Sequence, residues 1–392
     1  PTTTMANPSP PSFRVVSTQF PKRRNRHCSV AVPCSGSIIV IGGADNLNNA
    51  SCSVTLYNAK TEEITCLPNL KKPLAQHTTT AIGNHVYIMG GVHSSLQDSC
   101  TSVIRLNLTT QTWETINPMT TARRGHCAAI YQDKIFVFGG YDESSVEYFD
   151  TSKIDARWCS LCRMNSLMGQ RLGAAAVTIK HKIYVIGGYI AGVPSKSMIA
   201  FNICTSCYEE MAQMPMALAD HIAVAYRHYI IVIGGVSEDC RTVRDICLVY
   251  DVEKDSWCGS LHEQRMVVPR YLHSATLFDS GKLVVTMGRD GSGNATNSME
   301  EIFVLGLLPC EVRNREIRRP DHEGRLPIHV AAEQGLGWED GMKFLAMSYP
   351  ESLAIPSKDG NIPIISAASA GKTADLSSIY KMFRMMIGFG YV

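Results

Sequence analysis

Short runs of β-branched and aromatic residues that end on two glycines recur along this chain of 392 residues. In Lys134–Gly140, for example, the residues Ile-Phe-Val-Phe lead directly into the glycine pair. Apolar runs of this length, bounded by turn residues, are typical of buried strands. The first glycine of each run falls at position 42, 90, 139, 187, 234 or 288, so the steps are 48, 49, 48, 47 and 54 residues. The chain is therefore a repeat protein.

The repeats share further positions at fixed distances from the glycines. A glycine has no Cβ, so it can adopt positive φ and allow another backbone to come close. On that ground we predict structural roles for Gly42, Gly43, Gly90, Gly91, Gly139, Gly140, Gly187, Gly188, Gly234, Gly235 and Gly288. A second strand ends at Asn or Asp, and a large side chain then opens a further strand. The structural aromatics expected at or near these positions are Phe13, Trp113, Trp158, Tyr208 and Trp257.

Each repeat thus supplies four short strands, and a single four-stranded sheet of this size would leave an apolar face bare. Repeats of about 40 to 50 residues with four strands each are typical of a propeller, in which the sheets pack around an axis. The sixth repeat stops after Met299–Leu305 without a fourth strand. Phe13–Phe20 has the layout of a fourth strand, so we predict that residues 13–18 form the outer strand of the sixth sheet.

Two polar columns complete the pattern. Histidines stand 13 residues before the first glycine in the middle repeats and 15 before it in the first and sixth, except that the fourth repeat has Ala174; they are His27, His77, His126, His221 and His273. Arginines stand three residues before that column in four of the repeats, at Arg24, Arg123, Arg171 and Arg270. With the double glycines and the aromatics, these columns resemble kelch repeats over residues 13 to about 308. The resemblance implies an all-β six-bladed kelch β-propeller that binds proteins through loops at one mouth.

Beyond the sixth repeat the apolar period changes from two to nearly four, which indicates helices. Residues 309–320 are rich in charge and are interpreted as a linker. Pro327 and Pro363 open two similar motifs 36 residues apart, and a helix is expected from Trp338 to Tyr349, before Pro350. The segment 321–392 resembles a diverged, small all-α pair of ankyrin repeats. About three such units are needed to bury a continuous core, so the segment is either incomplete or supported by other contacts.

The expected organisation is therefore a disordered tail over residues 1–11, a propeller over 12–308, a linker over 309–320 and ankyrin-like helices over 321–392. The formal net charge of +2 does not suggest nucleic-acid binding, although Lys22–His27 forms one dense basic cluster. We find no run of about 18 apolar residues, so no membrane contact is predicted. Fourteen cysteines at irregular spacing favour a reducing, cytoplasmic or nuclear location over a disulfide framework.

No catalytic residue, metal or cofactor is predicted from a motif. The pairs Cys159/Cys162 and Cys204/Cys207 suggest zinc, but they begin 45 residues apart, against about 15 to 20 in structural zinc sites. The histidine column follows the repeat, as a packing rule does, and is interpreted as structural. No Gly-x-Ser-x-Gly, phosphate-binding glycine loop or His-Glu-x-x-His is present.

The arginine column allows two interpretations. Loops after the second strand and crossovers between sheets emerge at the same end of an antiparallel propeller, and the arginines lie on the crossovers. Each either braces a neighbouring loop or joins a basic rim that binds an acidic peptide by bidentate pairing. We therefore expect an interaction scaffold or adaptor for a protein partner, with a second contact through the ankyrin-like helices. The alternative is a small-molecule isomerase or lyase whose acid and base lie on loops. The sequence names neither the partner nor the oligomeric state, and it does not identify a ubiquitin-ligase adaptor.

Overall fold

The computed structural model describes residues 11–33, 35–93, 98–161, 169–258, 264–369 and 376–389. The expected tail therefore lies outside the described residues, apart from Pro11. The chain divides into two compact units. The larger comprises Val15–Thr276 and Val285–Glu300, and the smaller includes Leu277–Val284 and the residues from Glu301 onward.

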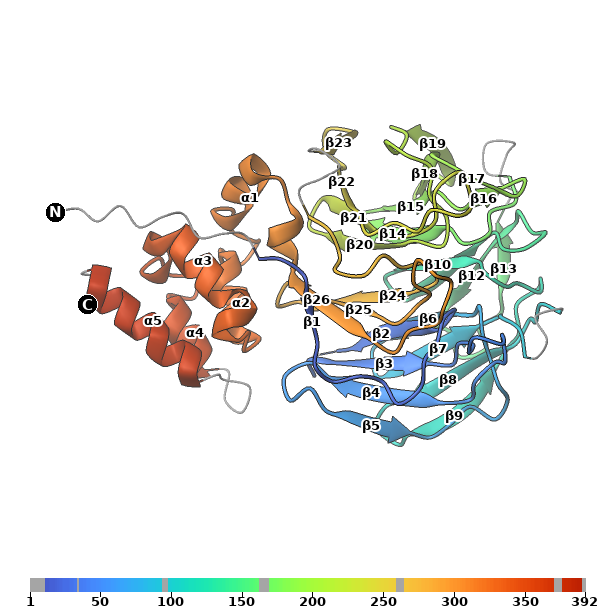
Figure 1. The fold of residues 1–392 in the computed structure, drawn as a ribbon, viewed down its shortest axis with the longest axis horizontal. Helices are drawn as coiled ribbons and strands as arrows, with labels where there is room; N and C mark the ends of the chain where they lie inside the picture. The colour runs from blue at the N-terminus through green and yellow to red at the C-terminus, as the bar shows by residue number, and fades with distance from the viewer. Residues whose placement is uncertain are drawn as a thin grey trace. The chain divides into compact units, whose positions relative to one another are not determined.

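Four consecutive strands build each of the first three antiparallel sheets, or blades (Figure 1). Their strands are β2 (Cys28–Val32), β3 (Ser37–Ile41), β4 (Val54–Asn58) and β5 (Ile64–Leu67); β6 (Thr78–Ile82), β7 (His85–Met89), β8 (Val103–Asn107) and β9 (Thr112–Ile116); and β10 (Cys127–Tyr131), β11 (Lys134–Phe138), β12 (Val146–Asp150) and β13 (Cys159–Leu161).

The remaining blades differ in two details. The fourth contains β14 (Ala175–Ile179), β15 (Lys182–Ile186), β18 (Met198–Asn202) and β19 (Cys207–Met211). The loop that connects β15 to β18 contains a small hairpin of β16 (Tyr189–Ile190) and β17 (Val193–Pro194). The fifth contains β20 (Ile222–Tyr226), β21 (Tyr229–Ile233), β22 (Cys247–Asp251) and β23 (Ser256–Cys258). The sixth has the order β1 (Arg14–Val15), β26 (Met299–Phe303), β25 (Lys282–Thr286) and β24 (Ser274–Leu277).

The first strand of the chain therefore completes the sixth blade, as the sequence predicts. The Val16 N–H donates to the Met299 carbonyl at 3.0 Å, and the Phe20 N–H donates to the Asn297 carbonyl at 3.0 Å. The paired strand is shorter than the predicted span of residues 13–18, because only Arg14 and Val15 have strand pairing. The buried Phe13 side chain precedes it. The six-bladed propeller is confirmed.

The glycine pairs hold neighbouring blades together. The N–H of the second glycine donates to a carbonyl in the next crossover at 2.7–2.9 Å; the pairs are Gly43–Leu74, Gly91–Arg123, Gly140–Arg171, Gly188–Leu218, Gly235–Arg270 and Gly288–Arg24. Gly288, counted in the sequence with the first glycines, occupies the second position, because Met287 stands in the first. The first glycine has positive φ and lies against the same carbonyl, so that a Cβ added to Gly90 would lie 2.5 Å from the Arg123 oxygen. Positive φ and this close approach are the geometry that the sequence-based interpretation of these glycines requires.

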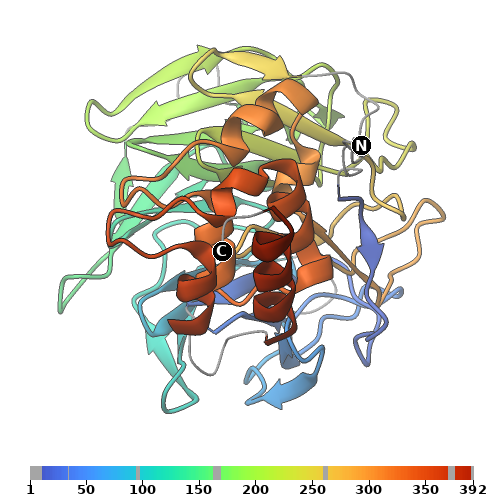
Figure 2. The same cartoon turned by 90° about the vertical axis from the view of Figure 1, so that its left-hand side faces the viewer.

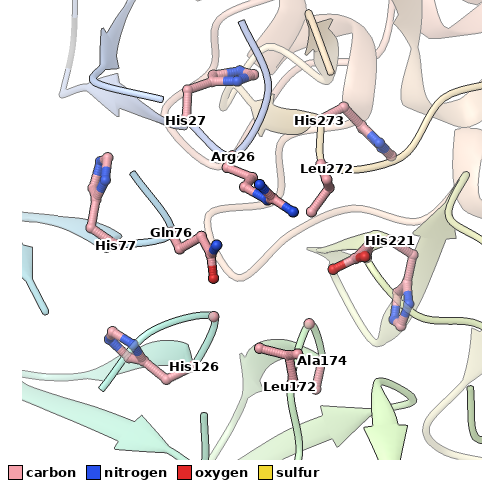
Figure 3. Close-up of a pocket in the computed structure, with 13 residues that line it drawn as sticks. Arg26, His27, Gln76, His77, His126, Leu172, Ala174, His221, Leu272 and His273 are labelled. Atoms are coloured by element: carbon pink, nitrogen blue, oxygen red, sulfur yellow. The ribbon is translucent and has the colours of Figure 1, made fainter. Parts of the chain in front are cut away.

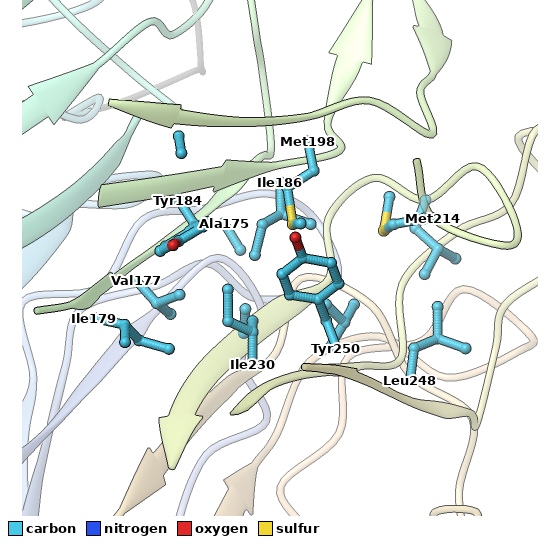
Figure 4. Packing of buried hydrophobic residues seen from close by; sticks show 14 of the residues in the cluster. Ala175, Val177, Ile179, Tyr184, Ile186, Met198, Met214, Ile230, Leu248 and Tyr250 are labelled. Atoms are coloured by element: carbon cyan, nitrogen blue, oxygen red, sulfur yellow. The ribbon is translucent and has the colours of Figure 1, made fainter. Parts of the chain in front are cut away.

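Apolar side chains fill the space between adjacent blades. Figure 4 shows this packing between the fourth and fifth blades, where Ile186 and Met198 face Ile230 and Tyr250. The fourth strands are tied across the same boundaries by indole N–H groups. The three tryptophans of the propeller donate to carbonyls at the end of the preceding blade: Trp113 to Pro68 at 2.9 Å, Trp158 to Asn117 at 3.0 Å and Trp257 to Ala212 at 3.0 Å. The Tyr208 ring packs on Phe201 with centroids 5.0 Å apart.

The smaller unit is mainly helical. Its helices are η1 (Val304–Leu307), α1 (Cys310–Ile317), α2 (Pro327–Glu333), η2 (Trp338–Met342), α3 (Lys343–Ser348), η3 (Pro350–Leu353), α4 (Pro363–Ser369) and α5 (Leu376–Phe389). Figure 2 shows these helices clustered together in the orange and red part of the chain. Among the helices of the described part, none combines the length and apolar character needed to cross a membrane.

Two sequence expectations need correction here. The segment interpreted as a linker is helical over α1, where the buried Arg313 guanidinium donates to the Leu308 carbonyl at 2.8 Å and Ile317 is also buried. The charged composition concealed these inward-facing positions. The single helix expected from Trp338 to Tyr349 is divided into η2 and α3, because Gly341 takes a non-helical φ of 143°.

Candidate binding site at the mouth of the propeller

The loops after the second strands pair with the crossovers between blades, so both lie at the same end of the propeller. Backbone bridges join Asn25 to Ala44, Ala75 to Val92, Leu172 to Tyr189, Ala219 to Val236 and Tyr271 to Arg289. We call the end of the propeller formed by these loops and crossovers the mouth.

Six residues, one from each crossover, form a closed ring of backbone hydrogen bonds at the mouth. Each lies immediately before the histidine column and has φ between 52° and 64°. Each N–H donates to the carbonyl of the preceding member at 2.9–3.0 Å, and the members are Arg26, Gln76, Gly125, Gly173, Asp220 and Leu272. The Leu272 carbonyl accepts from Arg26, which closes the ring. Figure 3 shows the Arg26 and Gln76 side chains reaching into the central opening.

The histidines lie behind this ring and point away from the opening (Figure 3). All five are at most 6% exposed. Burial lowers the pKa of His27 and His126 to about 3 and that of His77 and His221 to about 4, so these rings are neutral near pH 7. The His126 Nε2 lies 2.8 Å from the Thr78 hydroxyl oxygen. The five histidines are among the residues that line the central pocket of Figure 3, and their buried, neutral rings support a structural role for the column.

The arginine column is buried as well, with exposures of 2%, 0%, 1% and 0% for Arg24, Arg123, Arg171 and Arg270. Their guanidinium groups brace the loops after the second strands. Arg123 donates to the Gly139 carbonyl at 2.8 Å and pairs with Glu147 at 2.9 Å, and Arg270 pairs with Glu300 at 2.6 Å. Arg171 donates to the Gly187 carbonyl at 2.8 Å, and Arg24 to the Gly42 carbonyl at 3.2 Å.

The interpretation of this column as loop bracing is therefore the one that the hydrogen bonds support. A guanidinium enclosed by its own protein has no surface with which to bind a partner, so the hypothesis that these four arginines form the basic rim is corrected. The physical reason is the position of each residue along its crossover. The four arginines of the column face into the blade, whereas Arg26 and Arg124, one or two residues further on, lie toward the mouth.

A cavity of about 560 Å³ opens at the mouth beside the ring. Three arginines and one aspartate are among its lining residues. Arg26 and Arg289 both donate to the Asn48 side-chain oxygen, at 2.9 and 3.0 Å, so that one amide holds the two cations together. Burial lowers the pKa of Arg26, and the proximity of Arg289 and Arg124 lowers it further, while Asp220 opposes the shift.

Asp220 supplies the negative charge in this cavity. Its carboxylate accepts a hydrogen bond from the Tyr189 hydroxyl at 3.2 Å. Burial raises the pKa of Asp220 to about 6, although Arg26 and the Tyr189 hydroxyl act in the opposite direction. Burial together with Asp220 also raises the pKa of Tyr189. Gly173 leaves room for the carboxylate, since an added Cβ would lie 2.3 Å from an Asp220 oxygen.

A second, more apolar hollow of about 300 Å³ adjoins the first through Tyr189. It is lined by Tyr141, Leu172 and Ala191 among others. The Tyr141 side chain is 46% exposed, and the Arg124 guanidinium lies 4.0 Å from the centre of its ring. The mouth therefore presents a cationic cavity next to an aromatic shelf.

The two Cys-x-x-Cys pairs of the sequence are described only in part. Cys159, Cys204 and Cys207 are exposed free thiols, while Cys162 lies outside the described residues. No group of three or more His, Cys, Asp or Glu side chains is placed to hold a metal ion within the residues that the structure describes.

The comparison with protein families decides the classification. A family model described as the KLHDC2/KLHL20/DRC7 Kelch-repeats domain matches residues 11–188 and 76–288, which together cover more than half of the chain. This chain belongs to the kelch-repeat family. Its matches to individual kelch proteins include Kelch-like protein 36 of Rattus norvegicus, which is 28% identical over 183 residues, covering 45% of this chain and 28% of the relative.

Two other kelch relatives cover more of the chain. Kelch-like protein 38 of Danio rerio is 26% identical over 263 residues, covering 65% of this chain and 43% of the relative. Kelch-like protein terF of Aspergillus terreus is 26% identical over 231 residues, covering 53% of this chain and 49% of the relative. The chain thus spans less than half the length of these curated relatives.

Proposed function

We propose that this kelch protein is an interaction scaffold or adaptor, and that it binds an acidic segment of a protein partner at the mouth. The observation that carries the proposal is the cavity in which Arg26 and Arg289 are held by one Asn48 oxygen. Two cations fixed side by side repel each other, and a carboxylate placed between them relieves that repulsion. Arginine is also the residue best suited to bidentate carboxylate recognition.

The neighbouring hollow supports a peptide-like occupant. Tyr141 and Tyr189 offer aromatic surface, and buried aromatic and arginine side chains dominate the binding energy of many protein interfaces. A segment that places a carboxylate in the cationic cavity and an apolar side chain on Tyr141 uses both features. The low net charge of the whole chain favours a local acidic ligand over an extended polyanion.

The test is comparative affinity capture with the full chain. We expect an Arg26→Ala/Arg289→Ala variant to lose a partner that the wild type captures, with recovery reduced about tenfold or more, since each charged contact is worth about 1.5–3 kcal/mol. The control is Lys153→Ala/Lys254→Ala, because both lysines are exposed and lie on turns between third and fourth strands. Recovery that is unchanged in the arginine variant, or reduced equally in both variants, would exclude the mouth as the site of partner binding.

One observation favours a second function, the small-molecule enzyme. The Asp220 carboxyl, with its pKa of about 6, and the Tyr189 hydroxyl form an acid–base pair in the cavity. Groups that titrate near neutral pH suit proton transfer in an isomerase or lyase. Asp220→Asn separates the two functions. It should abolish turnover of a small substrate but leave the captured partner in place, because Asp220 does not attract an acidic ligand.

We further propose that α2, η2–α3, α4 and α5 are two diverged ankyrin repeats that provide a second contact. Support comes from the packing of α2 against α4 and from the equivalent prolines, Pro327 and Pro363, which both open helices. Deletion of residues 321–392 should weaken partner capture without abolishing it. Capture at wild-type strength would contradict the second contact.

A further inference from the structure

The two helical repeats have the same register but different exposure. α2 with η2–α3 forms the first repeat, and α4 with α5 forms the second, displaced by 36 residues. In the first repeat His329 is 0% exposed and Ala332 is 2% exposed. α4 packs against α2, and the His329 Nε2 lies 2.9 Å from the Ile355 carbonyl oxygen, just before the second repeat. The first repeat thus has a stacking face that the second repeat covers.

The corresponding positions of the second repeat are exposed among the residues that the structure describes. Ile365 takes the place of His329 and is 45% exposed, and Ala368 takes the place of Ala332 and is also exposed. The inner positions behave alike in the two repeats, since Ala331 and Ala367 are both buried. A face that meets solvent in a helical stack is normally polar. At the described positions Ile365 and Ala368 this face is apolar, so it is suited to receive another helix as α2 receives α4.

α5, which contacts α4, carries further exposed apolar side chains. One side of this helix is buried through Met382 and Met386, with exposures of 0% and 3%. The other side carries Tyr380, Phe383 and Ile387, which are 62%, 44% and 53% exposed. Positions three, four and seven residues apart share one side of a helix, so the three side chains form a stripe. Together with Ile365 and Ala368 they make up what we call the outer face.

The charges beside the outer face are of one sign. Between Leu376 and Phe389 the sequence contains Lys381 and Arg384 but no Asp or Glu. Lys381 lies over the Trp338 ring, 5.8 Å from its centre. Arg384 is exposed beside the stripe.

We propose that the outer face docks an amphipathic helix with acidic flanks from a protein partner. A helix is the expected occupant because the outer face has the same positions, 36 residues further on, as the face of α2 against which α4 packs. Acidic flanks fit because they complement Arg384, whereas a second copy of this chain would bring Arg384 against a like charge. The contact is independent of the mouth and does not rest on the function proposed for it.

The probe is a synthetic 18-residue amphipathic helix with leucines on one side and glutamates on both flanks, labelled for fluorescence anisotropy. Its twin carries lysines in place of the glutamates. We expect the full chain to bind the glutamate peptide at least about tenfold more tightly than the lysine peptide, with Phe383→Glu abolishing the binding and Arg384→Glu reversing the preference. Ile154→Glu is the matched control, because Ile154 is fully exposed in the β12–β13 turn and remote from α5 in sequence.

Three results would overturn the proposal. The first is equal affinity for the two peptides, or affinity for neither. The second is sedimentation that shows a dimer lost in Phe383→Glu, which would assign the face to a second copy. The third is binding to anionic phosphatidylserine vesicles that Phe383→Glu removes while peptide binding is absent. Unchanged circular dichroism and melting of Phe383→Glu would show that the variant is folded.

Discussion

The Gly288 N–H donates to the Arg24 carbonyl oxygen at 2.9 Å. These residues lie at opposite ends of the propeller sequence, yet they repeat the contact that Gly90 and Gly91 make with Arg123 in the interior of the ring. The same bond therefore joins every neighbouring pair of blades, including the last and the first. The ring of blades is thus closed by the same hydrogen bond that joins its other blades, and the mouth is a continuous rim.

The glycine contact predicts a difference between two alanine substitutions. Gly90 and Gly83 have similar φ, 60° and 54°, so Ala strains the backbone equally at both. An added Cβ at Gly83 meets nothing within 4 Å, whereas at Gly90 it meets the Arg123 carbonyl at 2.5 Å. Gly83→Ala should cost about 1–2 kcal/mol of unfolding free energy, and Gly90→Ala clearly more. Urea denaturation measures both, and equal losses would contradict the close-approach role.

The buried Arg123–Glu147 pair predicts that losing its arginine costs much more stability than losing the arginine of an exposed pair. Both side chains are 0% exposed, and removing one member leaves an uncompensated charge. Arg123→Ala should therefore lower the unfolding free energy by about 3–5 kcal/mol. Arg105→Ala is the control, because its partner Glu114 is exposed and such pairs contribute about 1 kcal/mol or less. A small loss in Arg123→Ala would contradict bracing.

The histidine column predicts acid sensitivity. The pKa of each of these histidines is lowered in the folded state, to about 4 for His77, from an unfolded value near 6.5. The unfolded chain therefore binds more protons below pH 6.5, and stability falls as pH decreases from 6.5 toward 4. Each histidine contributes about 1.4 kcal/mol per pH unit in this window. His77→Gln should reduce the slope of unfolding free energy against pH by the contribution of one proton. His322→Gln, a change at an exposed position, should leave that slope as in the wild type. A pH-independent unfolding free energy between 6.5 and 4.5 would refute this assignment.

Asp220 predicts how partner binding changes with pH. Its pKa of about 6 means that the carboxylate is negative at pH 7.5 and largely neutral at 5.5. Arginine keeps its charge over this range, so the cavity becomes more cationic as pH falls. Affinity for an acidic partner should rise from pH 7.5 to 5.5, and Asp220→Asn should bind at pH 7.5 as the wild type does at 5.5. Asp155→Asn, an exposed change in the β12–β13 turn, should behave as wild type. Weaker binding by Asp220→Asn would contradict the proposal.

Much of the propeller could be predicted from the sequence because its contacts repeat. The Gly139–Gly140 pair, the Trp113 and Trp158 indoles and the Phe13 strand each obey a rule that several repeats share. Sequence periodicity records such rules well. It was less informative for α1, where Arg313, Glu316 and Ile317 face inward among charged neighbours, and for Gly341, whose φ of 143° divides a helix.

The candidate site was harder to predict for the same reason. Arg24 and Arg123 attracted attention because they recur, but recurrence indicated packing. Arg26 and Arg289 were missed, although the column before the histidines gave a signal. It contains Arg26, Gln76, Gly125, Gly173, Asp220 and Leu272, and this lack of agreement among repeats marks positions that packing does not fix. The joint contact with Asn48 depends on loops distant in sequence, and no spacing rule contains it.

Site-specific photo-crosslinking tests most directly the claim that a partner binds at the mouth. A photoreactive phenylalanine analogue at Arg241, an exposed residue of the cationic cavity, is compared with the same group at Ile154, in the turn between β12 and β13. We expect Arg241 to crosslink a protein through a peptide rich in Asp and Glu, with loss of the product in Arg26→Ala/Arg289→Ala. Crosslinks only from Ile154, or products from Arg241 that persist without the two arginines, would contradict the account.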